Sequence, residues 1–186
     1  MLVQIVAPIS LDKVLKLDDA KSFLKVIGNN DDANIQELIK SAIKEAEDIT
    51  NRQFADATYE LYLPCIHSHE IKLPKNPIIS VDKIEIMDLD GVYQEVDSST
   101  YYLYEKHEVG IIYFETIPSL GKTHKKAVKI TFKCGYGDNF PEDLRNWLNV
   151  RVSTLNEYKE ELVIGTIVAK TNHVNNVLDR YKIRSL

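Results

Sequence analysis

The longest helical pattern in the chain lies between Asp31 and Phe54. Apolar residues recur there at spacings of three and four, which places them on one face of an amphipathic helix. These residues are Ile35, Leu38, Ile39, Ala42, Ile43, Ala46 and Ile49. We expect Asp31 and Asp32 to supply side-chain oxygens and negative charge at the start of this helix. Asn51 is expected to end it, because asparagine tolerates the left-handed conformation.

Two more helices are predicted from the same periodicity. A short helix is expected to start at Asp18 as N-cap, to run to Leu24 and to be closed by Gly28. A second long helix is expected from Pro141 to about Glu161, because proline suits the first turn of a helix. Its apolar positions are Leu144, Trp147, Leu148, Val152, Leu155 and Tyr158. We expect it to pack against the first long helix.

The middle of the chain changes to a period of two, which is typical of half-buried strands. Alternating segments occur at 59–63, 71–73, 84–89, 92–96, 101–104, 109–114 and 128–132. Asp90-Gly91 is a hairpin signal between two of them. Leu2 to Val6 is a further strand, expected at a sheet edge and ending at Pro8. The predicted fold class is α+β: a helical core with an inserted antiparallel β unit at about 57–134.

The carboxyl-terminal segment differs from the rest of the chain, so we predict a domain at 1–162 and a tail at 163–186. The tail has four basic residues and Asp179, a net charge of +3, which leaves −8 for the rest of the total of −5. Val174, Val177, Leu178 and Tyr181 have the spacing of a short amphipathic helix. Such a helix is marginal in water without a surface to order it. That surface is either its own domain or a partner protein.

Composition limits the class of protein. The chain has 186 residues, 44% of them apolar, which is enough for an ordinary globular core. The net negative charge argues against a general nucleic-acid coat. Two distant cysteines define no disulfide framework and suggest reduced thiols in the cytoplasm. The apolar start lacks a basic region and is interrupted by Gln4 and Pro8, so we expect no signal peptide. No apolar run reaches the roughly 20 residues that a membrane span requires.

Candidate chemical motifs are few. Cys65, His67 and His69 alternate, and on a strand they would share a face as soft metal ligands, but Pro64 disturbs the strand and no fourth ligand is evident. Gly121-Lys122-Thr123 resembles the end of a phosphate loop, yet Thr116 stands where its first glycine is required. No catalytic constellation can be assembled from these residues. The family resemblance described below implies a structural protein that is not an enzyme, and we predict no cofactor and no metal.

Two further groups of residues suit interactions rather than catalysis. Lys122, Lys125 and Lys126 belong to a loop between strands and form a weak hypothesis for contact with a DNA backbone. Tyr101, Tyr102 and Tyr104 form the densest group of the ten tyrosines. Tyrosine is enriched in protein interfaces, but it is also an ordinary strand residue, and both interpretations remain open.

The order of these features resembles the head–tail connector (adaptor) family of tailed bacteriophages, in its longer form with a β insertion. The resemblance covers residues 1 to 162. It rests on a series of motifs in order: Leu17–Leu24, Asp31-Asp32, Ile49–Phe54, Leu73-Pro74 with Pro77-Ile78 and Ser80-Val81, Asp90-Gly91, Cys134–Asp138 and Pro141.

The resemblance implies a structural virion protein at the head–tail junction, assembled in the host cytoplasm. Family members form a ring, typically twelve-fold, beneath the portal, where they extend the DNA channel and dock the next neck component. The implied partners are other copies, the portal, a stopper or tail-completion protein, and DNA passing without sequence-specific binding; no membrane is implied. The residues hypothesised to dock on the portal are Val174, Val177, Leu178, Arg180, Tyr181, Lys182 and Arg184.

Three alternatives remain from the sequence. The first alternative is a stopper or tail-completion protein of the same particle, although two long helices argue against it. The second is a small metal-dependent enzyme that uses Cys65, His67 and His69. The third is a protein-binding module that forms no ring.

Overall fold

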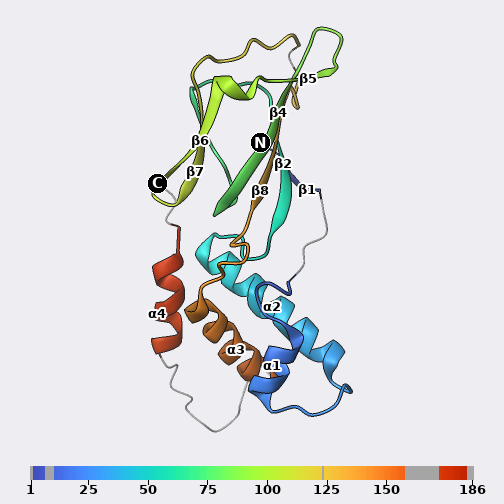
Figure 1. Cartoon of the computed structure of the whole chain (residues 1–186), viewed down its shortest axis with the longest axis vertical. Helices are drawn as coiled ribbons and strands as arrows, with labels where there is room; N and C mark the ends of the chain where they lie inside the picture. Colours follow the sequence, from blue (N-terminus) through green and yellow to red (C-terminus); the bar gives the residue numbers. More distant parts are fainter. Residues whose placement is uncertain (1, 7–10, 123, 158–171, 184–186) are drawn as a thin grey trace. The chain divides into compact units, whose positions relative to one another are not determined.

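The computed structural model describes residues 2–6, 11–122, 124–157 and 172–183. The chain divides into two compact units, each assembled from two separate segments. The β unit consists of Met1–Ile9 and Ala55–Tyr136, and the helical unit consists of Ser10–Phe54 and Gly137–Leu186. Figure 1 shows the elements coloured along the sequence. An α+β fold was predicted, and the helices and antiparallel sheets confirm it.

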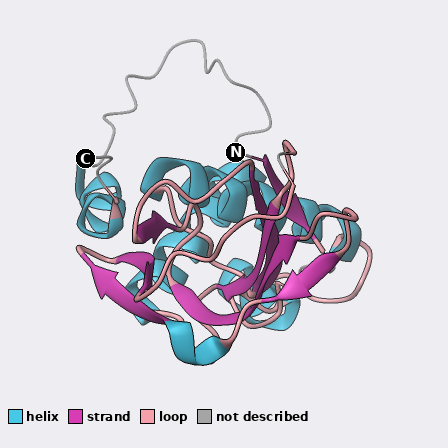
Figure 2. Cartoon of the chain, turned by 90° about the horizontal axis from the view of Figure 1, so that it is seen from above, coloured by secondary structure: helices cyan, strands magenta, loops and turns pink. Residues whose placement is uncertain are grey.

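The described part of the β unit holds a five-stranded sheet in the order β1-β2-β8-β4-β5 and a three-stranded sheet in the order β3-β7-β6. Neighbouring strands are antiparallel throughout. Figure 2 shows these strands in magenta. Their bounds are β1 Leu2–Ile5, β2 Ala57–Leu63, β3 Glu70–Lys72, β4 Ile78–Met87, β5 Tyr93–Glu95, β6 Tyr101–Lys106, β7 Val109–Phe114 and β8 Val128–Cys134, with a 3₁₀ turn η1 at Ser98–Thr100.

The period-two pattern places alternate residues in the core of the β unit, as predicted. In β8, Ile130 and Phe132 are fully buried, whereas Lys129 and Lys133 lie on the other face. Residues from both sheets form one hydrophobic cluster, so the two sheets bury their apolar faces together. The most buried members are Leu61, Ile84, Ile112, Phe114, Val128, Ile130, Phe132 and Cys134. Strand β1 is at the edge of its sheet, as expected from the sequence.

The β4–β5 connection confirms the Asp90-Gly91 hairpin. Asp88 Oδ1 accepts hydrogen bonds from the backbone N–H groups of Asp90 (3.0 Å) and Val92 (2.8 Å). Gly91 has a φ of +85°, a conformation that side chains other than glycine rarely adopt. The turn is therefore fixed by its own side-chain and backbone chemistry.

The helical unit contains α1 (Leu17–Leu24), α2 (Asp32–Thr50), α3 (Glu142–Glu157) and α4 (Asn172–Tyr181). Helix α2 packs against the other three, which fits its long apolar face. Its buried positions are Ile35, Ile39, Ala42, Ile43, Ala46 and Thr50. Helix α3 buries Leu144, Trp147, Leu148 and Val152. The predicted end of α3, to about Glu161, lies outside the described residues.

The apolar face of α2 ends differently from the prediction. Ile49 was expected to face the core but is 37% exposed, whereas Thr50 is fully buried. Successive helical residues are about 100° apart, so Thr50 falls inside the buried arc of the last turn and Ile49 at its edge. The buried hydroxyl of Thr50 donates to the carbonyl of Ala46 (2.7 Å), which satisfies its polar group.

The capping of α1 also differs from the prediction. Helix α1 starts at Leu17 with Lys16 at the N-cap, so Asp18 lies in the first turn and caps nothing. Lys25, not Gly28, ends it with a left-handed φ of +57°.

At α2, one end differs from the prediction and the other confirms it. Asp31 occupies the N-cap position without a side-chain capping bond, and Asp32 pairs with Lys21 Nζ (2.6 Å) instead. Asn51 is left-handed with φ +56°, as predicted. Among the described residues, no helix has the length and apolar character to cross a membrane.

Candidate interaction surfaces

Helix α4 packs against α2 and α3 within the helical unit (Figure 1). Leu178 is its anchor and is only 1% exposed, whereas Val177 is half-buried and Asp179 is exposed. Burial of one leucine side chain stabilises by about 1.5–3 kcal/mol. A ten-residue helix is marginal in isolation, so we expect this burial to contribute to the order of α4. We call the surface that holds it the α4 seat: Thr50, Asn51, Arg52 and Asp143.

Asp143, in the first turn of α3, supplies one side of the α4 seat. Its Oδ1 accepts from the Tyr181 hydroxyl (2.7 Å), and its Oδ2 accepts from Arg180 Nη2 (3.0 Å). The Arg180 side chain is 65% exposed, so the ion pair is worth at most about 1 kcal/mol. The Tyr181 hydrogen bond is better shielded and contributes about as much.

The carboxyl end of α2 supplies the other side of the α4 seat. The Ile183 N–H donates to the carbonyl of Thr50 (2.9 Å), and Asn51 Nδ2 donates to the carbonyl of Ile183 (3.3 Å). Arg52 Nε donates to the carbonyl of Tyr181 and its guanidinium lies over the Tyr181 ring, 5.9 Å from the centroid. The carbonyls of Thr50 and Tyr181 lie at helix ends, which would otherwise leave them open.

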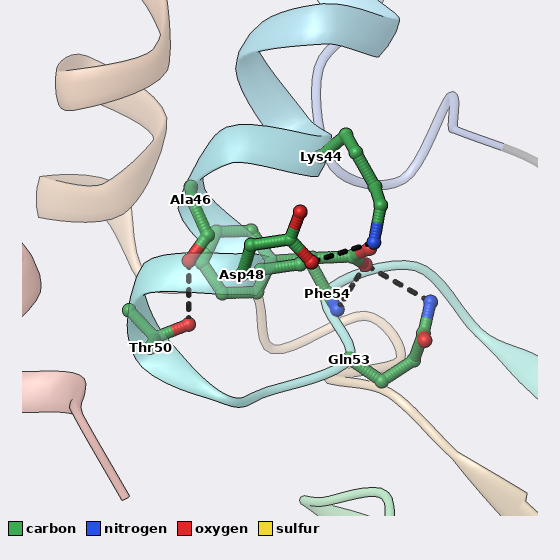
Figure 3. A network of polar contacts seen from close by, with 7 residues as sticks. Lys44, Ala46, Asp48, Thr50, Gln53 and Phe54 are labelled. Atoms are coloured by element: carbon green, nitrogen blue, oxygen red, sulfur yellow. Dashed lines mark hydrogen bonds and ion pairs between the residues drawn. The ribbon is translucent and has the colours of Figure 1, made fainter.

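A hydrogen-bond network fixes the turn that carries the seat (Figure 3). Glu47 Oε1 accepts from Gln53 Nε2 (2.9 Å) and from the backbone N–H of Phe54 (2.8 Å), which bends the chain back along the last turn of α2. One turn earlier, Lys44 donates to Asp48 (2.6 Å), and this hydrogen bond raises the pKa of Lys44. The position of Thr50 to Arg52 is thus set by α2 itself.

The tail residues predicted from the sequence lie mostly on this helix. In the structure α4 rests on its own unit, the first of the two alternatives. Leu178 and Tyr181 contact the unit, while Arg180 and Lys182 remain exposed. The side chain of Val174, and Arg184, lie outside the described residues. Contact of this set with a portal stays a prediction.

Asp143 and Arg52 were not found by sequence reasoning. Asp143 looks like an ordinary acidic residue at a helix start, and Arg52 like a solvent-exposed residue after a helix.

The predicted lysine group lies in the connection from β7 to β8. Lys122 and Lys125 are exposed. Lys126 is half-buried, and its Nζ lies over the Tyr62 ring, 4.4 Å from the centroid, while its carbonyl accepts from the Tyr93 hydroxyl (2.7 Å). Two of the three lysines are therefore placed to meet a partner, and the third holds the loop to the sheet.

The polar face of the five-stranded sheet neutralises its own charges. Glu85 pairs with Lys129 (2.6 Å) and Lys83 (3.1 Å). Burial raises the pKa of Glu85, but the hydrogen bonds from these lysines outweigh it, so the net shift of that pKa is downward. The Tyr62 hydroxyl donates to Glu60 (2.6 Å), which with partial burial raises the pKa of Tyr62 to about 12. The face holds paired charges rather than an activated nucleophile.

The clustered tyrosines divide between the two faces of the three-stranded sheet. Tyr101 packs against the core through Phe114, whereas Tyr102 is 48% exposed and stacks on Tyr113 with centroids 5.2 Å apart. The Tyr104 hydroxyl donates to Glu70 (2.7 Å), which raises the pKa of Tyr104 to about 12. Only part of the cluster is available to a partner protein.

The residues of the predicted metal motif are not brought together as a set of ligands. Cys65 Sγ lies 2.8 Å from His67 Nε2, but His69 donates from Nδ1 to the carbonyl of Phe114 (2.6 Å) and stacks on Tyr113. Across the residues that the structure describes, no group of three or more histidine, cysteine, aspartate or glutamate side chains is placed to hold a metal ion. Neither Cys65 nor Cys134 forms a disulfide.

Comparison with known families gives one match that spans nearly the whole chain. The family model described as "HCP: Head completion protein" matches residues 13–183. That range includes the helices, the β insertion and the tail helix. Among the curated proteins, none matches this chain.

Three of the solved structures with a similar fold come from gene transfer agent (GTA) particles. A chain in "Neck of empty GTA particle computed with C6 symmetry" has a TM-score of 0.81 at 19% identity. Chains in "Virion of native gene transfer agent (GTA) particle" and in "Neck of native GTA particle computed with C12 symmetry" have TM-scores of 0.79 and 0.77 at 19% and 18% identity. Each alignment covers 100% of this chain and 98% of the other. The likeness is one of fold.

Proposed function

Because the chain belongs to the head completion protein family, we propose that it is a structural protein in the neck of a tailed bacteriophage or phage-like particle. Several copies form a ring beneath the portal, which extends the DNA channel and docks the next neck component. The observation that carries this proposal is the family match over residues 13–183. The fold likeness to chains in neck structures computed with C6 and C12 symmetry supports the ring.

In this role the chain is not an enzyme. Its partners are other copies of itself, the portal, and a stopper or tail-completion protein, all at the head–tail junction of the virion. A ring of identical subunits requires a head-to-tail interface, in which two different surfaces of each copy meet. The net charge of −5 suits a channel that DNA passes through, since carboxylates do not neutralise phosphates.

We further propose that the tail helix α4 docks on the portal. Two forms of this docking differ in what happens at the α4 seat. If the portal binds Arg180 and Lys182, which are exposed, α4 stays seated. If the portal binds Leu178 and Tyr181, α4 must leave the seat, because Leu178 is 1% exposed there.

The test is negative-stain imaging of the protein mixed with its cognate portal. The full chain is compared with a truncation ending at Glu161, with the double variant R180E/K182E, and with K40E, a single charge reversal at an exposed position of α2, as a control. If rings form on the portal with the full chain and with K40E but not with the truncated chain, the result supports both the proposed function and docking by the tail helix. If rings still form with the truncated chain, the proposed function stands and docking by the tail is refuted. No association of the full chain at any salt concentration refutes the function.

A variant that weakens the contacts between α4 and its seat distinguishes the two forms of docking. Asp143→Asn weakens the contacts with Arg180 and Tyr181 without touching α4. If α4 must leave its seat, the variant binds portal more tightly, because the competing intramolecular state is destabilised. If α4 docks while seated, the variant binds more weakly.

A further inference from the structure

Two of the sheet edges in the β unit carry no charged side chain along four residues. Strand β1 is an end strand of the five-stranded sheet, and its whole length, Leu2–Ile5, is uncharged. Strand β6 is an end strand of the three-stranded sheet, and its first part, residues 101–104, is uncharged. Proteins ordinarily protect such edges with charges or proline, because the open backbone groups pair readily with another strand. These two edges lack that protection.

The other two sheet edges have the ordinary protection. End strand β5 contains Glu95 and follows a turn that contains Asp88 and Asp90. End strand β3 contains Glu70 and Lys72. Each of these two strands is only three residues long. Charge and length therefore leave β1 and β6 as the edges that are open to another strand.

The open side of β1 can be assigned from its pairing with β2. Just after β1, the N–H of Val6 donates to the carbonyl of Thr58 (2.9 Å). Because inward and outward residues alternate in an antiparallel pair, the backbone N–H and C=O groups of Val3 and Ile5 face away from β2. Among the described residues, no strand pairs with this side. The side chains are also open, since Leu2 is 44% and Ile5 is 55% exposed.

The open side of β6 follows from the same reasoning. Just before β6, the carbonyl of Thr100 accepts from the N–H of Glu115 (2.9 Å), so the backbone groups of Tyr101 and Leu103 face away from β7. Within the described part of the chain, β7 is the one strand that pairs with β6. Tyr102 is 48% and Leu103 is 38% exposed. Strand β6 therefore offers the same kind of edge as β1.

The occupant that satisfies both edges is a second copy of this chain. Open backbone N–H and C=O groups are satisfied by an extended strand that adds to the sheet. Pairing Val3 and Ile5 with Tyr101 and Leu103 would form about four backbone hydrogen bonds. It would also place β-branched side chains beside aromatic ones, which is a favourable cross-strand combination.

A contact between β1 and β6 is head-to-tail, because the two strands are different edges in different sheets. In Figure 1, β6 lies at the left of the β unit and β1 at its right. When β1 of one copy pairs with β6 of the next, the first copy keeps its β6 open and the second keeps its β1 open. Further copies can therefore add in the same way. Pairing of β1 with β1, or of β6 with β6, is two-fold and stops at two copies.

We propose that strand β1 of one copy pairs with strand β6 of the next and joins their sheets across the interface between neighbouring subunits of the ring. The inference rests on the proposed ring and adds which strands meet. The contact consists of backbone hydrogen bonds and apolar side chains, so raising the salt concentration should not weaken it.

The first test places a lysine on one edge at a time, because a lysine on an edge strand opposes pairing. Ile5→Lys blocks β1 and Leu103→Lys blocks β6, and each should weaken association at least about tenfold in sedimentation velocity and prevent rings on the cognate portal. Ile5→Thr and Leu103→Thr keep a strand-forming residue without a charge and should still form rings. Leu89→Lys, at an 80% exposed aliphatic position in the β4–β5 turn, is the matched control and should behave as the unchanged chain. Circular dichroism checks that each variant is folded.

A mixture of the two blocked variants tests the direction of the contact. Ile5→Lys keeps an open β6 and Leu103→Lys keeps an open β1, so an equimolar mixture should form complexes of two copies and no rings. If Leu103→Lys alone still forms pairs, the contact is β1 on β1. If Ile5→Lys alone still forms pairs, the contact is β6 on β6. Either result would overturn the head-to-tail pairing.

Hydrogen exchange in rings of the unchanged chain on the portal tests the pairing without any substitution. Peptides from residues 2–6 and 101–106 should exchange more slowly in the ring than in the free chain, whereas residues 88–92 should change little. Unchanged exchange at both edges, or rings that form equally well with both lysine variants, would overturn this contact and leave the proposed ring in place. No rings from the unchanged chain would overturn the ring, and this contact with it.

Discussion

Leu178→Ala tests whether the α4 seat is what orders the tail helix. Leu178 is 1% exposed, and truncation of a buried leucine costs about 2–5 kcal/mol. We expect the lower part of that range, about 2–3 kcal/mol, because a helix bound on one side can partly relax around the lost volume. We expect α4 to open without unfolding of the rest of the helical unit, so that the loss appears in its local opening equilibrium. A loss of this size accelerates amide exchange about 30- to 150-fold.

Hydrogen exchange followed by mass spectrometry of peptides from 172–183 measures this directly. Asp179→Ala is the matched control, because Asp179 is exposed on the same helix and its truncation should change exchange little. Exchange in α2 and α3 should be nearly unchanged for both variants. If Leu178→Ala exchanges no faster than Asp179→Ala over these residues, the seat does not order α4 and the reasoning fails.

Three further predictions concern other parts of the chain. Glu47→Ala should lower the stability of the helical unit by about 1–3 kcal/mol, because the partly buried N–H of Phe54 loses its acceptor. Lys44→Ala should lower it by less than about 1 kcal/mol, because its ion pair is exposed. Thermal melting compares the two variants. Raised pKa values of about 12 at Tyr62 and Tyr104 mean that the stability contributed by the neutral phenols is complete below pH 10 and is lost as pH rises toward 12. In a spectrophotometric titration Tyr62 and Tyr104 should be among the late-ionising phenols, so that Tyr62→Phe and Tyr104→Phe each remove one late phenol; ionisation of all ten tyrosines near pH 10 would contradict it. A thiol reagent should modify Cys65 in the folded chain and leave Cys134, which is 0% exposed, unmodified until unfolding; equal rates would refute the buried position.

The predictable part of this fold is the part governed by local periodicity. The alternation in β8 and the three-and-four spacing in α2 each follow from one segment, and both elements form where the pattern placed them. The Asp90-Gly91 turn was predictable because its conformation depends on glycine. Helix capping was less predictable, because Asp32 pairs with Lys21 from another helix rather than with the backbone of its own first turn. That choice depends on tertiary neighbours, which a single segment does not encode.

The interaction surfaces were predictable only in part, for the same reason. The spacing of Val177, Leu178 and Tyr181 predicted an amphipathic helix, but it did not indicate which surface that helix contacts. Asp143 receives the Tyr181 hydroxyl from 38 positions away, and Arg52 reaches the Tyr181 carbonyl across 129 positions. Strand β1 was expected at a sheet edge, but the open edge of β6 becomes identifiable only once the strand order is known.

The two-segment construction of the helical unit has a consequence for how the chain is made. Helices α2 and α3 pack together, yet about 90 residues, most of them in the β unit, separate them along the chain. At translation rates of about 5–20 residues per second, α2 emerges roughly 5–20 s before α3 exists. For that interval the buried face of α2 lacks the part of its packing that α3 supplies. A newly made chain therefore passes through a period in which it depends on chaperones, or on rapid folding of the β unit, to avoid aggregation.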